Sequence, residues 1–327
     1  MPLSLHSEIA ATYGPVLEGL AAAPKTAPHD LAGVRNILDA MINGVANSIP
    51  ADPDIQLTTY EAPSYDGHIV KITRLAMTEE AAATDTIPPS PGPAVLYAHG
   101  GGFIHGDVAT WTRFVQRYVR ELNIPFFAVE YRLAPEHPFP AATEDLYAAL
   151  QWLQSHADEL GVDPARIATM GHSAGSSIAA ALGIMARDRG VEPPIAKQIL
   201  LYPALDDRNT AARPAIDPLT FWPSHWSIVA WNAYLGADNV GKDDVSPYVA
   251  PARLDDFQGL PKTYLDVGVL DILRDECISF AAGIAKEDIE VEVHVYPGMP
   301  HGFDLTTERY ETLDRAVANR VAALKGV

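Results

Sequence analysis

Short apolar runs and amphipathic stretches alternate along most of this chain. Each run is about as long as one buried strand, and between the runs apolar residues recur every three or four positions, which indicates helices. Strands buried on both faces and separated by helices predict an α/β fold with a mostly parallel sheet and helices on both sides. From residue 94 onward the expected strands are Ala94–Ala98, Phe126–Glu130, Arg166–Met170, Lys197–Tyr202, Lys262–Val267 and Ile289–Tyr296.

The segment before residue 94 follows a different pattern. Residues 1–50 are predicted to be helical, because after Asp30, a suitable N-cap, apolar residues recur at helical spacing: Leu31, Val34, Leu38, Met41, Ile42 and Val45. Two further strands, Ile55–Ala62 and His68–Met77, flank a turn at residues 64–67 and bring the expected sheet to about eight strands. The acidic and then proline-rich stretch from Thr78 to Pro93 is interpreted as an exposed excursion between strands.

A second interruption runs from residue 206 to residue 251 and is rich in proline and aromatic residues. Loops of this length usually form lids or binding elements, so we interpret it, together with the N-terminal helices, as a cap above the sheet. The predicted division is a helical cap part at 1–50, a first core part at 51–205, a cap insertion at 206–251 and a second core part at 252–327. Most of the cap aromatics should pack internally, with one or two lining an apolar acyl or alcohol pocket; these aromatics are Phe221, Trp222, Trp226 and Trp231. The candidates for the pocket are Phe103, Phe221, Trp222 and Trp226.

The composition of the chain disfavours several classes of binding partner. The chain of 327 residues has 23 Lys and Arg against 42 Asp and Glu, a formal charge of −19. Phosphate binding needs a basic face, so we expect no nucleic-acid partner and no docking on an anionic membrane surface. No stretch approaches the length of a membrane span. The single cysteine, Cys277, rules out an intrachain disulfide framework, and the first residues do not resemble a signal peptide, so a reducing, cytoplasmic location is expected.

The most informative motif is Gly171-His172-Ser173-Ala174-Gly175, between a predicted strand and a helix of small residues. A serine hydroxyl is a weak nucleophile and must be presented where a base can reach it. A sharp strand-to-helix turn presents it, and the glycines on both sides relieve the crowding that such a turn creates. The alternative interpretation is an ordinary turn, which the flanking strand and helix disfavour.

A glycine-rich loop, His99-Gly100-Gly101-Gly102-Phe103, follows the strand at Ala94–Ala98. Three glycines leave backbone N–H groups free to approach a developing oxyanion, as acyl transfer requires. The loop has neither the Gly-Lys-Ser/Thr end of a phosphate-binding loop nor the spacing of a dinucleotide-binding loop. A metal site using the nearby His105 and Asp107 is a weaker alternative, and we expect no metal because no third ligand clusters with them.

An acid and a histidine should follow the serine along the chain, each on a loop after a strand. Asp271 follows the strand at Lys262–Val267, and His301 follows the strand at Ile289–Tyr296 between a proline and a glycine. Asp266 and Asp275 are close competitors for the role of the acid.

At this point the chain resembles the hormone-sensitive-lipase group of α/β-hydrolase esterases, which includes bacterial family IV carboxylesterases. The resemblance spans residues 93–303 and rests on five motifs in order: residues 99–103, 131–136 (Tyr-Arg-Leu-Ala-Pro-Glu), 171–175, 271–276 and 301–303. It implies Ser173 as nucleophile, His301 as base and Asp271 as the orienting acid. The backbone N–H groups of Gly101, Gly102 and Ala174 would form the oxyanion hole, supported by His99, Gly100, Gly171, His172 and Gly175.

Two residues depart from the family pattern. His172 stands where the family usually has aspartate, which should alter local hydrogen bonding without loss of the nucleophile. Ile272 stands where proline usually follows the acid, which should loosen that loop slightly. The segment at residues 131–136 is expected to be structural, holding the loop beneath the oxyanion glycines.

The resemblance implies a cap-bearing α/β-hydrolase that cleaves short- to medium-chain carboxylic esters through an acyl-enzyme on Ser173, without a cofactor. The negative charge favours neutral esters as substrates. A lactone, an aryl amide or a carbamate remains an alternative substrate of the same triad. A non-hydrolytic small-molecule receptor or a dehydratase on the same fold is a further alternative, disfavoured because Ser173 and His301 are both present. A homodimer remains open.

Overall fold

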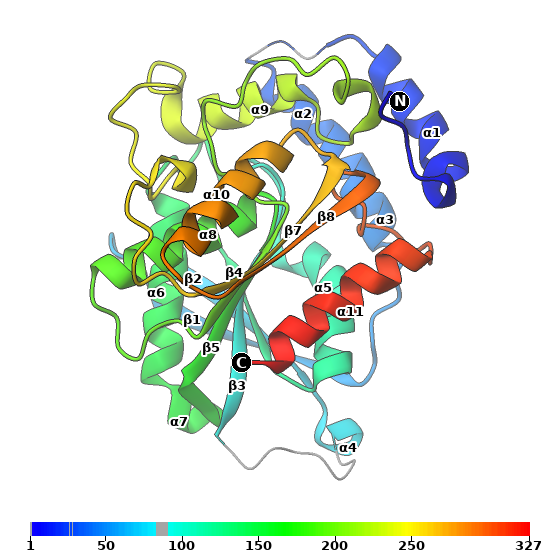
Figure 1. The fold of residues 1–327 in the computed structure, drawn as a ribbon. Helices are drawn as coiled ribbons and strands as arrows, with labels where there is room; N and C mark the ends of the chain where they lie inside the picture. Colours follow the sequence, from blue (N-terminus) through cyan, green and yellow to red (C-terminus); the bar gives the residue numbers. More distant parts are fainter. Residues whose placement is uncertain (1, 26, 28, 83–90) are drawn as a thin grey trace.

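One sheet of eight strands forms the centre of the described chain (Figure 1). The computed structural model describes residues 2–25, 27, 29–82 and 91–327. The sheet order is β1-β2-β4-β3-β5-β6-β7-β8. Strands from β4 to β8 are parallel, whereas β2 runs antiparallel to both β1 and β4. The bounds are β1 Ile55–Pro63, β2 Ile69–Met77, β3 Gly92–Ala98, β4 Phe126–Glu130, β5 Val162–His172, β6 Lys197–Leu201, β7 Lys262–Leu270 and β8 Val291–Pro300.

The mostly parallel sheet predicted from the apolar runs is confirmed. The central strands are buried on both faces: every residue of β6 is buried, as are all but the first of β3. Several strands extend beyond the expected ranges: β5 begins at Val162, β7 continues to Leu270 and β8 continues to Pro300. The extension of β8 follows an irregularity in β7, after which Leu270 pairs with Pro300. As a result, β7 and β8 end directly before Asp271 and His301.

Helices cover both faces of the sheet. α5 (Val108–Leu122) and α11 (Glu311–Lys325) lie on one face, and α6 (Ala141–Ser155), α8 (Ala174–Asp188) and α10 (Arg274–Lys286) lie on the other (Figure 1). α5 shows why the sequence forms a helix here: Asp107 Oδ1 accepts a hydrogen bond from the backbone N–H of Thr110 at 2.7 Å, which caps its first turn. Its apolar stripe, which includes Phe114 and Tyr118, faces the sheet. The short α7 (Ala157–Leu160) precedes β5.

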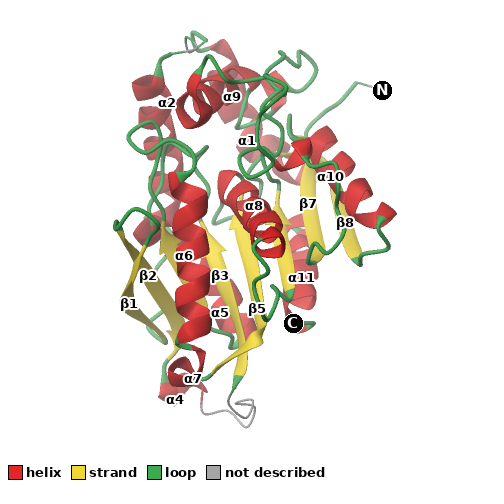
Figure 2. Ribbon diagram, turned by 90° about the vertical axis from the view of Figure 1, so that its left-hand side faces the viewer, coloured by secondary structure: helices red, strands yellow, loops and turns green. Residues whose placement is uncertain are grey.

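The N-terminal helices and the insertion after β6 gather beyond the carboxyl ends of the parallel strands (Figure 2). The first group comprises α1 (Ser7–Ala22), α2 (Leu31–Leu38), the π-helix η1 (Asp39–Asn43) and α3 (Gly44–Ala46). The insertion contains η2 (Asp217–Leu219), α9 (Ser224–Trp231) and the π-helix η3 (Asn232–Gly236), and η4 (Pro251–Arg253) follows it. α1 contacts η2, and α2 contacts α9. This arrangement agrees with a two-part cap, although the boundaries drawn from the sequence remain a prediction.

The helix expected from Leu31 to Val45 starts where the sequence predicted, since Asp30 Oδ1 accepts from the N–H of Gly33 at 2.9 Å. The structure divides it by the π-helical turn η1. The predicted excursion at Thr78–Pro93 contains α4 (Glu79–Ala82) and the start of β3, and its residues 83–90 lie outside the described residues. Within the part of the chain that the structure describes, no helix is both long and apolar enough to cross a membrane.

Candidate active site

Ser173 occupies the turn between β5 and α8. Its backbone φ of 52° and ψ of −120° lie in a region that non-glycine residues rarely adopt. The turn is tight enough to exclude side chains on both sides: a Cβ on Gly171 would lie 2.4 Å from the carbonyl carbon of Gly175, and one on Gly175 would lie 2.2 Å from the carbonyl oxygen of Ala98. The glycines of the motif are therefore a steric requirement of this backbone.

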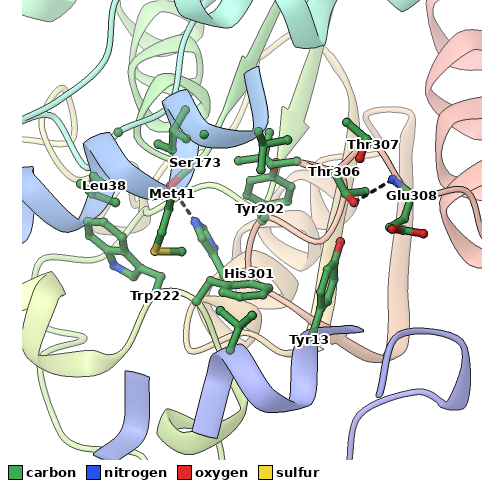
Figure 3. Close-up of a pocket in the computed structure, with 18 of the residues that line it drawn as sticks. Tyr13, Leu38, Met41, Ser173, Tyr202, Trp222, His301, Thr306, Thr307 and Glu308 are labelled. Carbon is green, nitrogen blue, oxygen red and sulfur yellow. Dashed lines mark hydrogen bonds between the residues drawn. The ribbon is translucent and has the colours of Figure 1, made fainter. Parts of the chain in front are cut away.

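A continuous hydrogen-bonded chain joins the three predicted polar residues. His301 Nε2 lies 3.0 Å from Ser173 Oγ, and His301 Nδ1 lies 2.7 Å from Asp271 Oδ2 (Figure 3 shows the Ser173–His301 bond). Asp271 is fully buried, and its other oxygen accepts from the N–H of Leu273 at 2.9 Å. A carboxylate held in this way keeps the imidazole proton on Nδ1 and leaves Nε2 free to accept the serine proton.

The two competing aspartates have other partners. Asp266 lies within β7 and pairs with Arg320, whose Nε donates to Asp266 Oδ2 at 2.6 Å. Asp275 is exposed and pairs with Arg213 and Arg274. Of the three acids, the structure brings Asp271 alone to His301 Nδ1.

The glycine loop borders the same cavity as Ser173 and His301. Gly101 and Gly102 both line it. Ala174 is fully buried directly after Ser173 and does not line the cavity, but as the first residue of α8 its N–H belongs to the helix end whose donors have no partner within the helix. The loop after β3 therefore borders the same cavity as the nucleophile, and the start of α8 directly follows it.

His99 supports the glycine loop through buried contacts. It is fully buried, its Nδ1 lies 2.8 Å from the carbonyl oxygen of Gly100, and its ring stacks on Tyr131 with centroids 4.2 Å apart. The Tyr131 hydroxyl donates to the carbonyl oxygen of His99 at 2.7 Å. Burial lowers the pKa of His99 to about 4, so the imidazole is neutral at physiological pH. The segment beginning at Tyr131 thus braces the loop, as the sequence predicted.

His172, the departure in the elbow, belongs to a buried polar network. Its Nδ1 lies 2.9 Å from the Tyr97 hydroxyl, and its Nε2 lies 3.5 Å from Asp304 Oδ2. Burial lowers the pKa of His172, although Asp304 opposes that shift. Asp304 also accepts a hydrogen bond from the Tyr202 hydroxyl at 2.6 Å and pairs with the buried Arg320. Burial would raise the pKa of Asp304, but Arg320, His172 and Tyr202 hold this pKa well below its usual range.

The Ser173 hydroxyl opens onto a mostly apolar cavity of about 370 Å³ between the sheet and the cap. Two of the predicted aromatics, Phe221 and Trp222, line it. The Trp222 ring lies beside His301, with centroids 6.1 Å apart, and a Cβ on Gly102 would meet that ring at 2.3 Å. The sequence did not predict the other walls of the cavity, which include Tyr13, Leu38, Met41 and Tyr202 (Figure 3). Trp111 and Leu305 also line it.

Phe103 and Trp226 do not line this cavity, contrary to the expectation from sequence. The backbone of Phe103 has a φ of 65°, and its ring stacks on Tyr234 at 4.2 Å and contacts Trp231 at 5.1 Å. Trp226 meets Trp222 edge-on at 5.7 Å and borders a separate cavity between the end of α1 and the cap insertion. Both rings join aromatic contacts in and around the cap insertion, as does Trp231.

His105 and Asp107, the alternative metal ligands suggested by the sequence, have other partners. His105 Nε2 lies 2.8 Å from Asp39 Oδ1, and Asp107 caps α5. Among the residues that the structure describes, no cluster of three or more His, Cys, Asp or Glu side chains is arranged to hold a metal ion.

Comparisons with known proteins identify the fold and the relatives of this chain. Residues 95–305 match the family model of the α/β-hydrolase fold. The chain is 37% identical to esterase LipI of Mycobacterium tuberculosis over 64% of this chain and 65% of LipI, so the match spans just under two thirds of that relative. It is 33% identical to the carboxylesterase NlhH of the same species over 71% of this chain and 73% of NlhH.

Solved structures extend the likeness to nearly the whole chain. A bacterial heroin esterase is 37% identical, with a TM-score of 0.85 over 99% of this chain and 98% of that one. The esterase LipW from Mycobacterium marinum is 30% identical, with a TM-score of 0.79 over 95% of each chain. The five motifs, the sheet and these relatives together show that the chain belongs to the hormone-sensitive-lipase group of α/β-hydrolases.

Proposed function

We propose that this protein is a serine carboxylesterase in which Ser173 is the nucleophile, His301 the general base and Asp271 the orienting acid. The observation that carries the proposal is the buried chain from Asp271 through His301 to Ser173, with bonds of 2.7 Å and 3.0 Å, at the floor of an apolar cavity. The relatives named as esterases and carboxylesterases support the same reaction class.

The reaction follows from the positions of these groups. His301 Nε2 removes the proton from Ser173 Oγ as the oxygen attacks the acyl carbon. The backbone N–H groups of Gly101, Gly102 and Ala174 hold the oxyanion of the tetrahedral intermediate. His301 returns the proton to the leaving alcohol, and water then cleaves the acyl-enzyme by the same route. Asp271 keeps the imidazole in the required tautomer and stabilises its charged form.

The cavity and the net charge support neutral, short- to medium-chain esters as substrates. The lining is dominated by apolar and aromatic side chains, which favour an uncharged acyl or alcohol group. A formal charge of −19 disfavours anionic substrates and assists departure of the carboxylate product. Added salt should then raise kcat/KM for a negatively charged ester and leave that of a neutral ester almost unchanged; equal salt responses would contradict this choice of substrate.

Ser173→Ala tests the mechanism. The control is Ser279→Ala, which removes an exposed hydroxyl on α10. S173A should abolish hydrolysis of a chromogenic short-chain ester and labelling by a fluorophosphonate probe, while S279A retains both. Hydrolysis by S173A at the wild-type rate would refute the mechanism. Parallel assays of an ester, a lactone, an aryl amide and a carbamate rank the alternative substrates, and a wild-type protein that neither turns over nor labels would favour the receptor or dehydratase alternative.

We also propose a homodimer and a cytoplasmic location. The dimer is supported by β8, which is an edge strand: it pairs with β7 alone in the described sheet and exposes Val293. The open edge of such a strand can pair with a second copy of the chain. The location is supported by the single cysteine, Cys277, which is buried and free. Light scattering of the purified protein tests the first proposal, and fractionation of the source cells tests the second.

A further inference from the structure

The glycine loop and the residues that follow it, 99–107, are called the oxyanion loop below. The backbone of this loop needs contacts from other segments to hold its conformation. Gly101, Gly102 and Phe103 have consecutive positive φ angles of 127°, 62° and 65°. Phe103 is not a glycine, so this conformation is strained at that residue. Strained backbone persists only where surrounding contacts hold it in place. The contacts that hold this loop therefore decide where its N–H groups point.

Arg35 on α2 makes the principal contact with this loop from the N-terminal helices. Its Nε donates to the carbonyl oxygen of Ile104 at 2.8 Å, and its Nη2 donates to that of Ala134 at 2.8 Å. The N–H of Ala134 in turn donates to the carbonyl oxygen of Phe103 at 2.9 Å. One guanidinium thus joins the oxyanion loop to the segment that braces it. Ile104 and Ala134 are almost fully buried, so without Arg35 their carbonyl groups would lose these partners.

Glu136 fixes the orientation of that guanidinium. Arg35 Nη1 donates to Glu136 Oε1 at 2.7 Å, and Nη2 donates to Oε2 at 2.6 Å. A two-point contact of this kind sets the plane of the arginine as well as its position. The hydrogen bonds from Arg35 lower the pKa of Glu136 to about 2, so the pair stays charged across the pH range in which the protein would be assayed.

The element that carries Arg35 also forms a wall of the cavity. Leu38 at the end of α2 and Met41 in η1 line the cavity beside Ser173 (Figure 3). A second tie runs from the same segment to the loop, since Asp39 Oδ1 lies 2.8 Å from His105 Nε2. The segment from Arg35 to Met41 therefore both contacts the oxyanion loop and forms part of the cavity wall.

We propose that Arg35 is a positioning residue for the oxyanion hole, so that α2 contributes to kcat as well as to substrate binding. This inference rests on the proposed esterase function. Displacement of catalytic groups by about 1 Å through a remote substitution costs up to ~100-fold in rate. Loss of Arg35 should accordingly lower kcat by ~10- to 100-fold and leave KM nearly unchanged, because the cavity walls remain.

The test compares R35M, R35K and E136Q with R189M as the matched control. Arg189 is about as exposed as Arg35 and also makes a two-point pair with a glutamate, the less exposed Glu144, but at the far end of α8 from Ser173. The readouts are kcat and KM for a neutral chromogenic ester and the inhibition constant of an aryl trifluoromethyl ketone, whose serine adduct places an oxyanion in the hole. Hydrogen exchange in the peptide covering residues 99–107 reports loop order without requiring activity.

R35M should lower kcat and the affinity for the ketone by the same factor, because both depend on the oxyanion donors. The affinity for a neutral alcohol product should stay unchanged. R35K should show an intermediate loss, since a lysine cannot reach both carbonyl groups and the carboxylate. E136Q should lose less than R35M, because Arg35 keeps its bonds to the loop. Exchange at residues 99–107 should accelerate in R35M and stay at the wild-type rate in R189M.

Several results would overturn the inference. They are a wild-type kcat in R35M, a loss confined to KM, an equal loss in R189M, or unchanged exchange in the loop. If R35M does not fold, R35K and E136Q carry the same comparison. A wild-type protein that shows no turnover and no ketone binding would instead refute the proposed function, and the exchange measurement would still decide whether Arg35 holds the loop.

Discussion

Replacing Arg320 with methionine should destabilise the protein strongly. Arg320 on α11 is fully buried and pairs with two buried carboxylates: its Nε and Nη2 donate to Asp266 at 2.6 Å and 3.0 Å, and its Nη1 donates to Asp304. Nη1 also donates to the Tyr118 hydroxyl at 3.1 Å. R320M fills part of the space but leaves both carboxylates in the core without their cation.

The expected magnitude follows from that burial. Removing one partner of a buried ion pair costs about 3–5 kcal/mol of unfolding free energy, because the remaining charge is left without compensation. An unfolding entropy of ~2.1 cal/mol/K per residue gives roughly 0.7 kcal/mol/K for a chain of 327 residues. The melting temperature of R320M should therefore fall by ~4–7 °C.

Thermal melting followed by circular dichroism measures this change, and R120M is the control. Arg120 also contacts two aspartates, Asp52 and Asp54, but its side chain is 47% exposed, and exposed pairs contribute little. R120M should melt close to the wild type. An R320M melting temperature as near to wild type as that of R120M would refute the reasoning.

The same network predicts a pH dependence with a definite sign. The pKa of Asp304 is held below its unfolded value, so its contribution to stability is present above about pH 4 and is lost as the pH falls below that value. The difference in melting temperature between wild type and R320M should therefore shrink under acidic conditions. A difference that grew on acidification would contradict the charge assignment.

Three further predictions concern the site. Asp271→Asn should lower kcat by ~10⁴-fold because it stabilises the wrong tautomer of His301; steady-state kinetics with less than a tenfold loss would argue against Asp271 as the orienting acid. Trp222→Ala should raise the kcat/KM ratio of a branched-acyl ester over the acetyl ester by about tenfold, and an unchanged ratio would show that Trp222 does not limit the cavity. His99→Asn should flatten the fall in stability between pH 6.5 and about 4, where the unfolded state binds a proton that the buried imidazole does not. The pKa difference corresponds to ~3 kcal/mol of unfolding free energy. The measurement is the unfolding free energy as a function of pH. If H99N and wild type show the same slope over this pH range, a neutral buried His99 is contradicted.

The sequence predicted the sheet well because its central strands are buried on both faces, and a continuous apolar run such as Ala94–Ala98 is a strong signal. The elbow at Ser173 and the loop at Gly101 could also be predicted, because close packing and backbone conformation restrict those positions to particular residues. The π-helical turn at Asp39–Asn43 could not, since the apolar spacing of residues 31–45 is compatible with an uninterrupted α-helix.

The walls of the cavity could not be predicted from local pattern. Tyr13, Met41 and Leu305 are brought together by packing between segments far apart in sequence. Arg320 gave no sequence signal for the same reason, because its partners lie 54 and 16 residues away. Phe103 was a candidate for the pocket, but its positive φ belongs to a loop in which its ring packs against Tyr234.

The most direct test of the account is to trap the acyl-enzyme. The protein is mixed with an activated acetyl ester, quenched in acid during the pre-steady-state burst, and analysed by intact mass and peptide mapping. A mass gain of one acetyl group is expected, located on Ser173 and absent from S173A. Hydrolysis that proceeds with no acetyl group on Ser173, or with the acetyl group on another residue, would contradict it.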